Sequence, residues 1–183
     1  MPAAPGFYAW WSRRGALPAV PRVSHPADDE VSLLHVGVSP VRESSRQTLR
    51  TRALGNHLNG NVGSSTFRFV LAALLIDALQ LEPFVRGSKI VLDASDNAWL
   101  SAWQRDALPL TWSARERRWE IEGDVIRQLA PPLNSAGKAA HSFYACVRRV
   151  LSSGAARSCE PDGWGPHCSG NAFSPTDLLP LRG

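Results

Sequence analysis

The segment Trp119-Glu-Ile-Glu-Gly-Asp-Val-Ile-Arg-Gln-Leu-Ala-Pro-Pro-Leu-Asn134 decides the fold. Three of its apolar side chains recur at helical spacing and form one stripe: Trp119, Ile126 and Leu129. Glu122 falls on the same stripe, although burying a carboxylate is costly unless it is paired or binds a metal ion. Pro131-Pro132 then ends the helix. Either Glu122 is a functional carboxylate near the core, or the helix is short and Glu122 lies at its rim in water.

Length and composition place the chain among globular proteins. It has 183 residues, 44% of them hydrophobic and 20% charged, which suits one domain with its own core. The longest apolar run, from Phe69 to Ile76, is too short to cross a bilayer. The start, Met-Pro-Ala-Ala-Pro-Gly, lacks the charged and apolar regions of a signal peptide. We therefore expect a cytoplasmic protein without membrane association.

Apolar periodicity and turn residues predict a small mixed α/β (α+β) domain whose central sheet is flanked by helices. The expected strands are Gly6–Trp11, Val31–Val38 and 109–113, with a loop at 12–30 and a hairpin or single edge strand through Gly87-Ser88. The expected helices are 44–58, about 65–80, about 96–107, 117–130 and about 138–152. The helix at 65–80 is apolar on nearly every face, so it should be the central buried one.

Helix starts and the domain boundary follow from single residues and from composition. Ser64 or Ser65 is expected to cap the buried helix, and Ser95 the next one. Residues 1–153 form the predicted domain, and 154–183 form a flexible or disordered tail rich in Gly, Ser and Pro. The tail also carries Cys159, His167 and Cys168, which lack the paired Cys-x-x-Cys spacing of a zinc site.

Positive charge gathers in the first half of the chain. The formal net charge is +4, and five arginines but only one acid lie between Arg42 and Arg68. Arg42, Arg46 and Arg50 recur every four residues, so in a helix they form a basic ridge of the kind that binds nucleic acid. The alternative is a solvated helix face. Arg68 opens the buried helix, where it either binds phosphate or pairs with a carboxylate such as Glu82 or Asp77.

The order of several short motifs is specific. The first strand contains Gly6-Phe7-Tyr8 and the second contains His35-Val36-Gly37; a basic helix with Arg52 and His57 follows, and Glu122 precedes Asn134 by twelve residues within Pro-Pro-Leu-Asn. In this order and spacing, roughly residues 5–135 resemble the GIY-YIG nuclease superfamily. The resemblance implies a mostly antiparallel sheet and an endonuclease that hydrolyses DNA phosphodiester bonds.

The resemblance also implies roles for these residues. Glu122 would hold one Mg²⁺ or Mn²⁺ ion, because a hard cation that keeps several waters needs few protein oxygens. Tyr8, with His35, would position or activate the attacking water, and Arg52 would stabilise charge on the phosphate, with His57 beside it in the catalytic set. The remaining matched residues support the scaffold: Gly6, Gly37 and Asn134. We expect Tyr8, His35, Arg52 and Glu122 to line one cleft.

Two departures from the superfamily pattern leave alternatives open. His35 stands where tyrosine is usual, which either preserves activity, changes its pH dependence or marks a degenerate copy. Arg52 and His57 are five residues apart instead of four, and in an α-helix their side chains diverge by about 140°. A π-bulge near Gly55 would realign them. The other possible pair on one helix face is Arg50 with His57, which would make Arg50 the catalytic arginine.

Three functions remain to be distinguished. The first is the DNA endonuclease, with DNA as its partner and specificity supplied by another protein or by the tail. The second is a catalytically degenerate nucleic-acid-binding protein on the same scaffold. The third is an unrelated α/β protein, in which Tyr8 is a core aromatic residue and His35 a core histidine.

Overall fold

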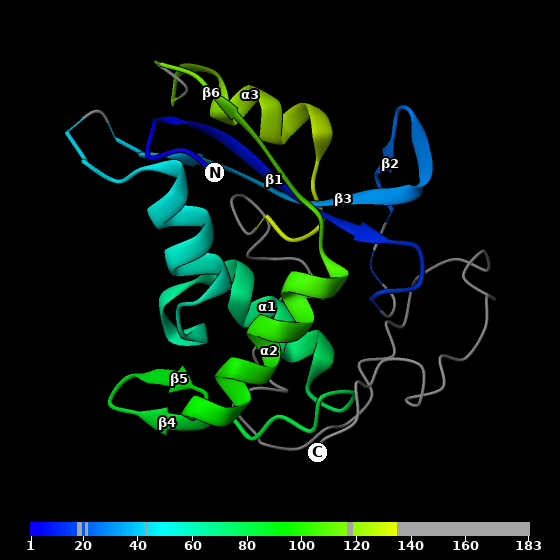
Figure 1. Ribbon diagram of the computed structural model, residues 1–183, viewed down its shortest axis with the longest axis vertical. Coiled ribbons are helices and arrows are strands. Elements are labelled where there is room, and N and C mark those ends of the chain that lie inside the picture. Colours follow the sequence, from blue (N-terminus) through cyan, green and yellow to red (C-terminus); the bar gives the residue numbers. More distant parts are fainter. Residues whose placement is uncertain (18–19, 21, 43, 117–118, 135–183) are drawn as a thin grey trace.

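The computed structural model describes residues 1–134 except 18, 19, 21, 43, 117 and 118. Its described part contains a four-stranded antiparallel sheet of order β2-β3-β1-β6 (Figure 1). The central strand β1 (Gly6–Arg13) pairs with β3 (Asp28–Ser39) on one side and with β6 (Leu110–Ala114) on the other. The short β2 (Ser24–His25) pairs with the beginning of β3. The expected mixed α+β fold with an antiparallel sheet is confirmed.

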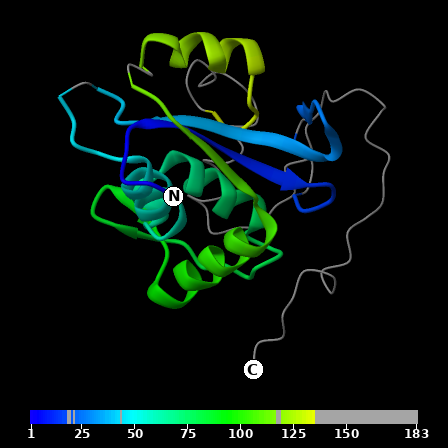
Figure 2. The ribbon, with the colours of Figure 1, turned by 45° about the horizontal axis from the view of Figure 1, so that its top comes forward.

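Helices cover both faces of this sheet. Figure 2 shows α3 (Trp119–Leu129) on one face and η1 (Arg50–Leu58), α1 (Thr66–Leu75) and α2 (Ala94–Ala107) on the other. Buried and partly buried residues alternate along β1, so that Tyr8 and Trp10 face the helices of the larger layer. There Trp10 stacks on Phe67 of α1 with ring centroids 5.7 Å apart.

The helix α1 lies at the centre of the core, as predicted. Ser65 caps it by accepting a hydrogen bond from the Arg68 backbone N–H, which satisfies a donor that the first helical turn leaves free. The helix buries residues on several faces, among them Phe67, Val70, Leu71 and Leu75. It ends at Leu75, several residues before the predicted end.

Short elements connect the helices of this layer. The 3₁₀-helix η2 (Val62–Ser64) precedes α1, and the predicted hairpin follows it as β4 (Phe84–Arg86) and β5 (Lys89–Val91). Gly87 takes the positive φ of 62° that this two-residue turn requires. Asp93, and not Ser95, caps α2, because its side chain accepts from the Asp96 N–H.

The helix predicted at 44–58 begins only at Arg50, which is a correction to the sequence analysis. Thr48 and Thr51 cap each other, each hydroxyl accepting a hydrogen bond from the other residue's backbone N–H. This reciprocal pairing satisfies donors at the start of the helix and fixes it there. Arg42 and Arg46 therefore lie in the preceding loop, and the predicted ridge with Arg50 on one helix face does not form.

Other boundaries also differ from the sequence analysis. The expected loop at 12–30 is partly strand, because β1 continues to Arg13 and β3 already begins at Asp28. The helix predicted at 138–152, the tail and its Cys159, His167 and Cys168 lie outside the described residues. No helix in the described part of the chain is long and apolar enough to cross a membrane.

Asn134 fastens the chain after α3 to the edge of β3. Its side-chain oxygen accepts from the Val36 N–H at 2.9 Å, and its side-chain nitrogen donates to the Val36 carbonyl at 2.8 Å. The Leu133 N–H donates to the Leu34 carbonyl at 2.9 Å, so residues 133–134 satisfy this edge as a strand would. The amide thereby fixes the end of the segment that carries α3.

We predict that Asn134→Ala lowers the free energy of unfolding by about 2–4 kcal/mol, because it leaves two backbone groups of Val36 buried without partners. Urea denaturation measures this change. Gln128→Ala, which truncates an exposed amide on α3, is the matched control and should change stability by less than about 0.5 kcal/mol. Equal effects of the two substitutions would show that the Asn134 hydrogen bonds do not hold this edge.

Candidate active site

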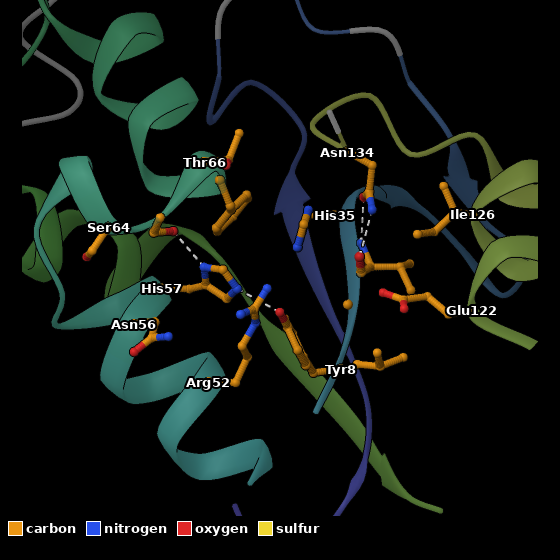
Figure 3. A pocket seen from close by; sticks show the side chains of 15 residues that line it. Tyr8, His35, Arg52, Asn56, His57, Ser64, Thr66, Glu122, Ile126 and Asn134 are labelled. Carbon is orange, nitrogen blue, oxygen red and sulfur yellow. Dashed lines mark hydrogen bonds between the residues drawn. The ribbon is translucent and has the colours of Figure 1, made fainter. Parts of the chain in front are cut away.

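A pocket of about 210 Å³ lies where η1, the start of α1, β3 and α3 meet (Figure 3). Most of its lining side chains are polar: Tyr8, His35, Arg52, Asn56, His57, Ser64, Ser65, Thr66, Glu122 and Asn134. The four residues expected in one cleft, Tyr8, His35, Arg52 and Glu122, all line it. They come from four separate elements, so the fold brings together what the sequence separates.

Tyr8 reaches the pocket because its neighbour on β3 has no side chain. Tyr8 pairs with Gly37 across the two strands, and a Cβ added to Gly37 would overlap the Tyr8 hydroxyl. The hydroxyl lies 2.6 Å from His57 Nε2, and Tyr8 itself is only 1% exposed. Burial raises the pKa of Tyr8 to about 12, against the opposing effect of Arg52. Tyr8 is therefore a buried phenol whose oxygen is fixed in position.

The helix η1 is a π-helix, and this geometry aligns Arg52 with His57. A π-helix forms its hydrogen bonds between residues five apart, so residues 52 and 57 meet on the same side. Both line the pocket, whereas Arg50 is exposed and does not. The realignment considered near Gly55 thus extends over the whole helix.

Arg52 presents a guanidinium to the pocket beside Tyr8 and His57 (Figure 3). One terminal nitrogen lies 3.5 Å from Gln47 Oε1, a long contact. The Nε atom is buried and has no hydrogen-bond partner among the described residues. Arg52 therefore retains unused donor capacity, which suits it to bind an anion in a planar, bidentate manner.

His35 and His57 are both neutral imidazoles in the pocket wall. Burial lowers the pKa of His35 to about 4 and that of His57 to about 2, and the positive charge of Arg52 adds to both effects. His35 stacks on Phe67 with ring centroids 4.8 Å apart. Its Nδ1 atom is buried without a hydrogen-bond partner in the described part of the chain.

Glu122 points from α3 toward the pocket and is half-buried (Figure 3). Burial raises the pKa of its carboxyl group, while Arg52 lowers it. Neither carboxylate oxygen has a hydrogen-bond or salt-bridge partner among the described residues, so both are free to coordinate a cation. Ile126 of the predicted stripe lines the same pocket, but Leu129 is 41% exposed, so the stripe is only partly buried.

Arg68 is a structural residue, which corrects its expected contact with nucleic acid. It is 0% exposed, and burial lowers its pKa to about 10. Its guanidinium donates to four partners: the Leu58 carbonyl, Asn97, Ser101 and Gln104. Within the described residues it forms no salt bridge with Asp77 or Glu82. These hydrogen bonds join η1, α1 and α2 and hold the helical layer together.

A family model described as the GIY-YIG catalytic domain matches residues 6–150. The chain belongs to the GIY-YIG family. Membership implies a nuclease, hence a nucleic-acid substrate, and GIY-YIG nucleases generally use a divalent metal ion. Neither the curated proteins nor the solved structures gave a match.

The pocket of this GIY-YIG domain suits a hard divalent cation in one respect: Glu122 offers free carboxylate oxygens at its wall. Among the described residues no group of three His, Cys, Asp or Glu side chains could hold a metal ion. A cation there would need oxygen atoms from substrate and water to complete its shell. The sequence analysis did not assign Ser65 to the site. The sequence pointed to Ser65 only as a candidate N-cap of the buried helix.

We predict that acid destabilises the domain because both pocket histidines are neutral in the folded state. The unfolded chain protonates histidine near pH 6.5, so below that pH it binds more protons and the free energy of unfolding falls. Two such groups contribute up to about 2.7 kcal/mol per pH unit between about pH 6 and 4.5. In His35→Phe, which retains the stacking on Phe67, this contribution should be halved.

Urea denaturation of both proteins at several pH values between 7 and 4.5 provides the measurement. The difference between the two slopes isolates His35, because the other titrating groups are common to both proteins. Identical slopes would mean that His35 is protonated as readily in the folded state as in the unfolded chain.

Proposed function

We propose that this GIY-YIG domain is a metal-dependent endonuclease that hydrolyses DNA phosphodiester bonds. The observation that supports this most directly is the convergence of Tyr8, Arg52 and Glu122 on one pocket. They offer, respectively, a fixed oxygen for a water molecule, a guanidinium with an unused Nε donor, and a carboxylate without a hydrogen-bond partner among the described residues. Phosphodiester hydrolysis needs groups of these three kinds.

In the proposed reaction the scissile phosphate lies between Arg52 and Glu122. Glu122 would hold the Mg²⁺ or Mn²⁺ ion, which when bound supplies electrophilic stabilisation of the phosphate and the leaving oxygen. Arg52 donates to the non-bridging oxygens and stabilises the charge that develops there. Tyr8, held by His57, orients the attacking water, and His35 shapes the neighbouring wall as a neutral ring.

DNA affinity would come from exposed arginines outside the pocket. Arg42, Arg46 and Arg50 are all exposed, the first two in the loop before η1 and the third at its first residue. Each of these arginines would neutralise one DNA phosphate, and this does not require that the three lie on the same helix face. Sequence specificity would then come from a further protein or from the tail, residues 154–183.

The second candidate is a nucleic-acid-binding protein without catalysis, and His35 is the residue that favours it. Histidine stands there in place of the usual tyrosine, its ring stacks on Phe67 in the pocket wall, and its buried Nδ1 atom has no hydrogen-bond partner in the described part of the chain. DNA binding with no cleavage in Mg²⁺ or Mn²⁺ would support this alternative. Cleavage that chelation abolishes would exclude it.

We expect Glu122→Gln to abolish cleavage while DNA binding is retained or strengthened. The substitution removes the metal-binding carboxylate and its repulsion of phosphate, but keeps the size of the side chain. Cleavage of duplex DNA in Mg²⁺ and fluorescence anisotropy provide the two measurements. Asp124→Asn, at an exposed carboxylate on the same helix, should cleave like the wild type. Undiminished Mg²⁺-dependent cleavage by Glu122→Gln would place the metal elsewhere.

Arg52 and Arg50 form a matched pair, one in the pocket and one outside it. For Arg52→Ala we expect the single-turnover rate at saturating DNA to fall about 10²-fold or more, with little change in affinity. Arg50→Ala should instead weaken binding and reduce its salt slope by about 0.9, with an unchanged rate. The reverse assignment of the two effects would show that Arg50 is the catalytic arginine.

A further inference from the structure

A buried chain of hydrogen bonds runs from the pocket to the start of α1. His57 Nε2 lies 2.6 Å from the Tyr8 hydroxyl, and His57 Nδ1 lies 2.6 Å from Ser65 Oγ. Ser65 Oγ also accepts from the Arg68 backbone N–H at 3.1 Å. Tyr8, His57 and Ser65 are 1%, 5% and 5% exposed. The direction of each proton along this chain decides what Tyr8 can do.

Ser65 determines that direction. A serine hydroxyl has one proton to donate and two lone pairs, and the Arg68 N–H occupies one lone pair. Among the described residues, the remaining hydrogen-bond partner of Ser65 Oγ is His57 Nδ1. If Nδ1 carried the ring proton, Ser65 would accept twice and its own buried proton would have no acceptor, at a cost of about 1–3 kcal/mol. Ser65 therefore donates to Nδ1, which must be unprotonated.

The positive end of the α1 dipole acts in the same direction. Ser65 is the N-cap of a ten-residue helix, where partial positive charge disfavours a further proton on a nearby imidazole. The positive charges of Arg52 and Arg68 also oppose the addition of a second proton to the His57 ring. His57 is therefore a neutral ring whose single proton is on Nε2, facing Tyr8.

We propose that Ser65 is a positioning residue that holds His57 in the tautomer with its proton on Nε2, so that His57 donates to the Tyr8 oxygen. Tyr8 then directs its own proton away from His57 and into the pocket. Four charged or titratable groups face Tyr8: Arg52 and His57 from η1, His35 from β3 and Glu122 from α3.

The consequence for the chemistry rests on the proposed nuclease function. Tyr8 passes its own proton to a solvent water in the pocket, and the resulting phenolate then takes one proton from the attacking water and becomes a phenol again. With the proton on Nε2, His57 and Arg52 both stabilise the negative charge on the Tyr8 oxygen and so oppose the burial that raises its pKa. In the other tautomer Tyr8 would donate to Nε2. Tyr8 could then lose its proton only to His57. Burial and the charges of Arg52 and Arg68 keep His57 from accepting that proton.

Two variants separate the tautomer from the helix cap. Ser65→Thr keeps both the cap and the hydroxyl proton. Ser65→Asp keeps the cap, but a carboxylate can only accept, so it draws the ring proton to Nδ1. Heteronuclear NMR of protein labelled with ¹⁵N-histidine reports the protonated nitrogen directly, and comparison with His57→Gln assigns the signals.

We expect protonated Nε2 in the wild type and in Ser65→Thr, and protonated Nδ1 in Ser65→Asp. Protonated Nδ1 in the folded wild type, or an Nε2 tautomer that survives in Ser65→Asp, would overturn the proposal. This measurement needs no substrate, so its outcome is distinct from the outcome for the nuclease itself.

A kinetic measurement then connects the tautomer to cleavage. With DNA and Mg²⁺ we expect Ser65→Asp to lower kcat about 10²-fold with little change in KM, as for loss of acid–base assistance. Ser65→Thr should remain near the wild type, and so should Ser95→Asp, which adds the same charge at an exposed position of α2. A wild-type kcat in Ser65→Asp would contradict the role of the tautomer. Absence of cleavage by the wild type would count against the nuclease and leave the NMR result to decide the position of the proton.

Discussion

The paired hydrogen bonds between the Asn134 side chain and the Val36 backbone are the constraint on which the site depends. They tie the end of the α3 segment to an edge of β3 where the strand would otherwise have unpaired backbone groups. The other charged or titratable side chains of the site, Tyr8, His35, Arg52 and His57, stand on β1, β3 and η1. Glu122 is the one contribution of α3 to the polar wall of the pocket. The position of a carboxylate is thus set by an amide twelve residues further along the chain.

A second constraint is the helix type of η1. A π-helix is less favourable than an α-helix and often occurs at functional sites. Here the π-helix places Arg52 and His57 on the same side although they are five residues apart. The His57 ring lies beside the Tyr8 ring, and the charge of Arg52 acts on the Tyr8 hydroxyl. The layer beneath is stabilised by Arg68, which bonds to the Leu58 carbonyl at the end of η1 and to residues of α2. A fixed, buried network of hydrogen bonds therefore holds the end of η1 in place.

Local signals predicted the strands and the central helix, because these depend on short-range spacing. The residues gathered in the pocket were predicted from the resemblance to the GIY-YIG superfamily. Tyr8 lies in a motif whose geometry is fixed by a strand, and Asn134 lies in a motif whose geometry is fixed by the pair Pro131-Pro132. The signals failed where distant partners decide the outcome. Arg68 carries the same charge as any phosphate-binding arginine, and only its contacts with α2 and Leu58 reveal it as structural. The early start of β3 at Asp28 was missed because its first residues are polar and exposed.

The net charge of the pocket relates the neutral state of its two histidines to the roles proposed for Arg52 and Glu122. Because burial and neighbouring cations keep His35 and His57 neutral, Arg52 and Glu122 are the charged side chains that face the pocket among the described residues. Their charges cancel, so a phosphodiester entering between them would leave one negative charge in excess in a partly desolvated space. A divalent cation on Glu122 would reverse that sign and favour entry. A protonated histidine would only cancel the excess negative charge, and it would compete with the cation. Two neutral histidines therefore favour the proposed binding of a divalent cation by the single carboxylate of Glu122.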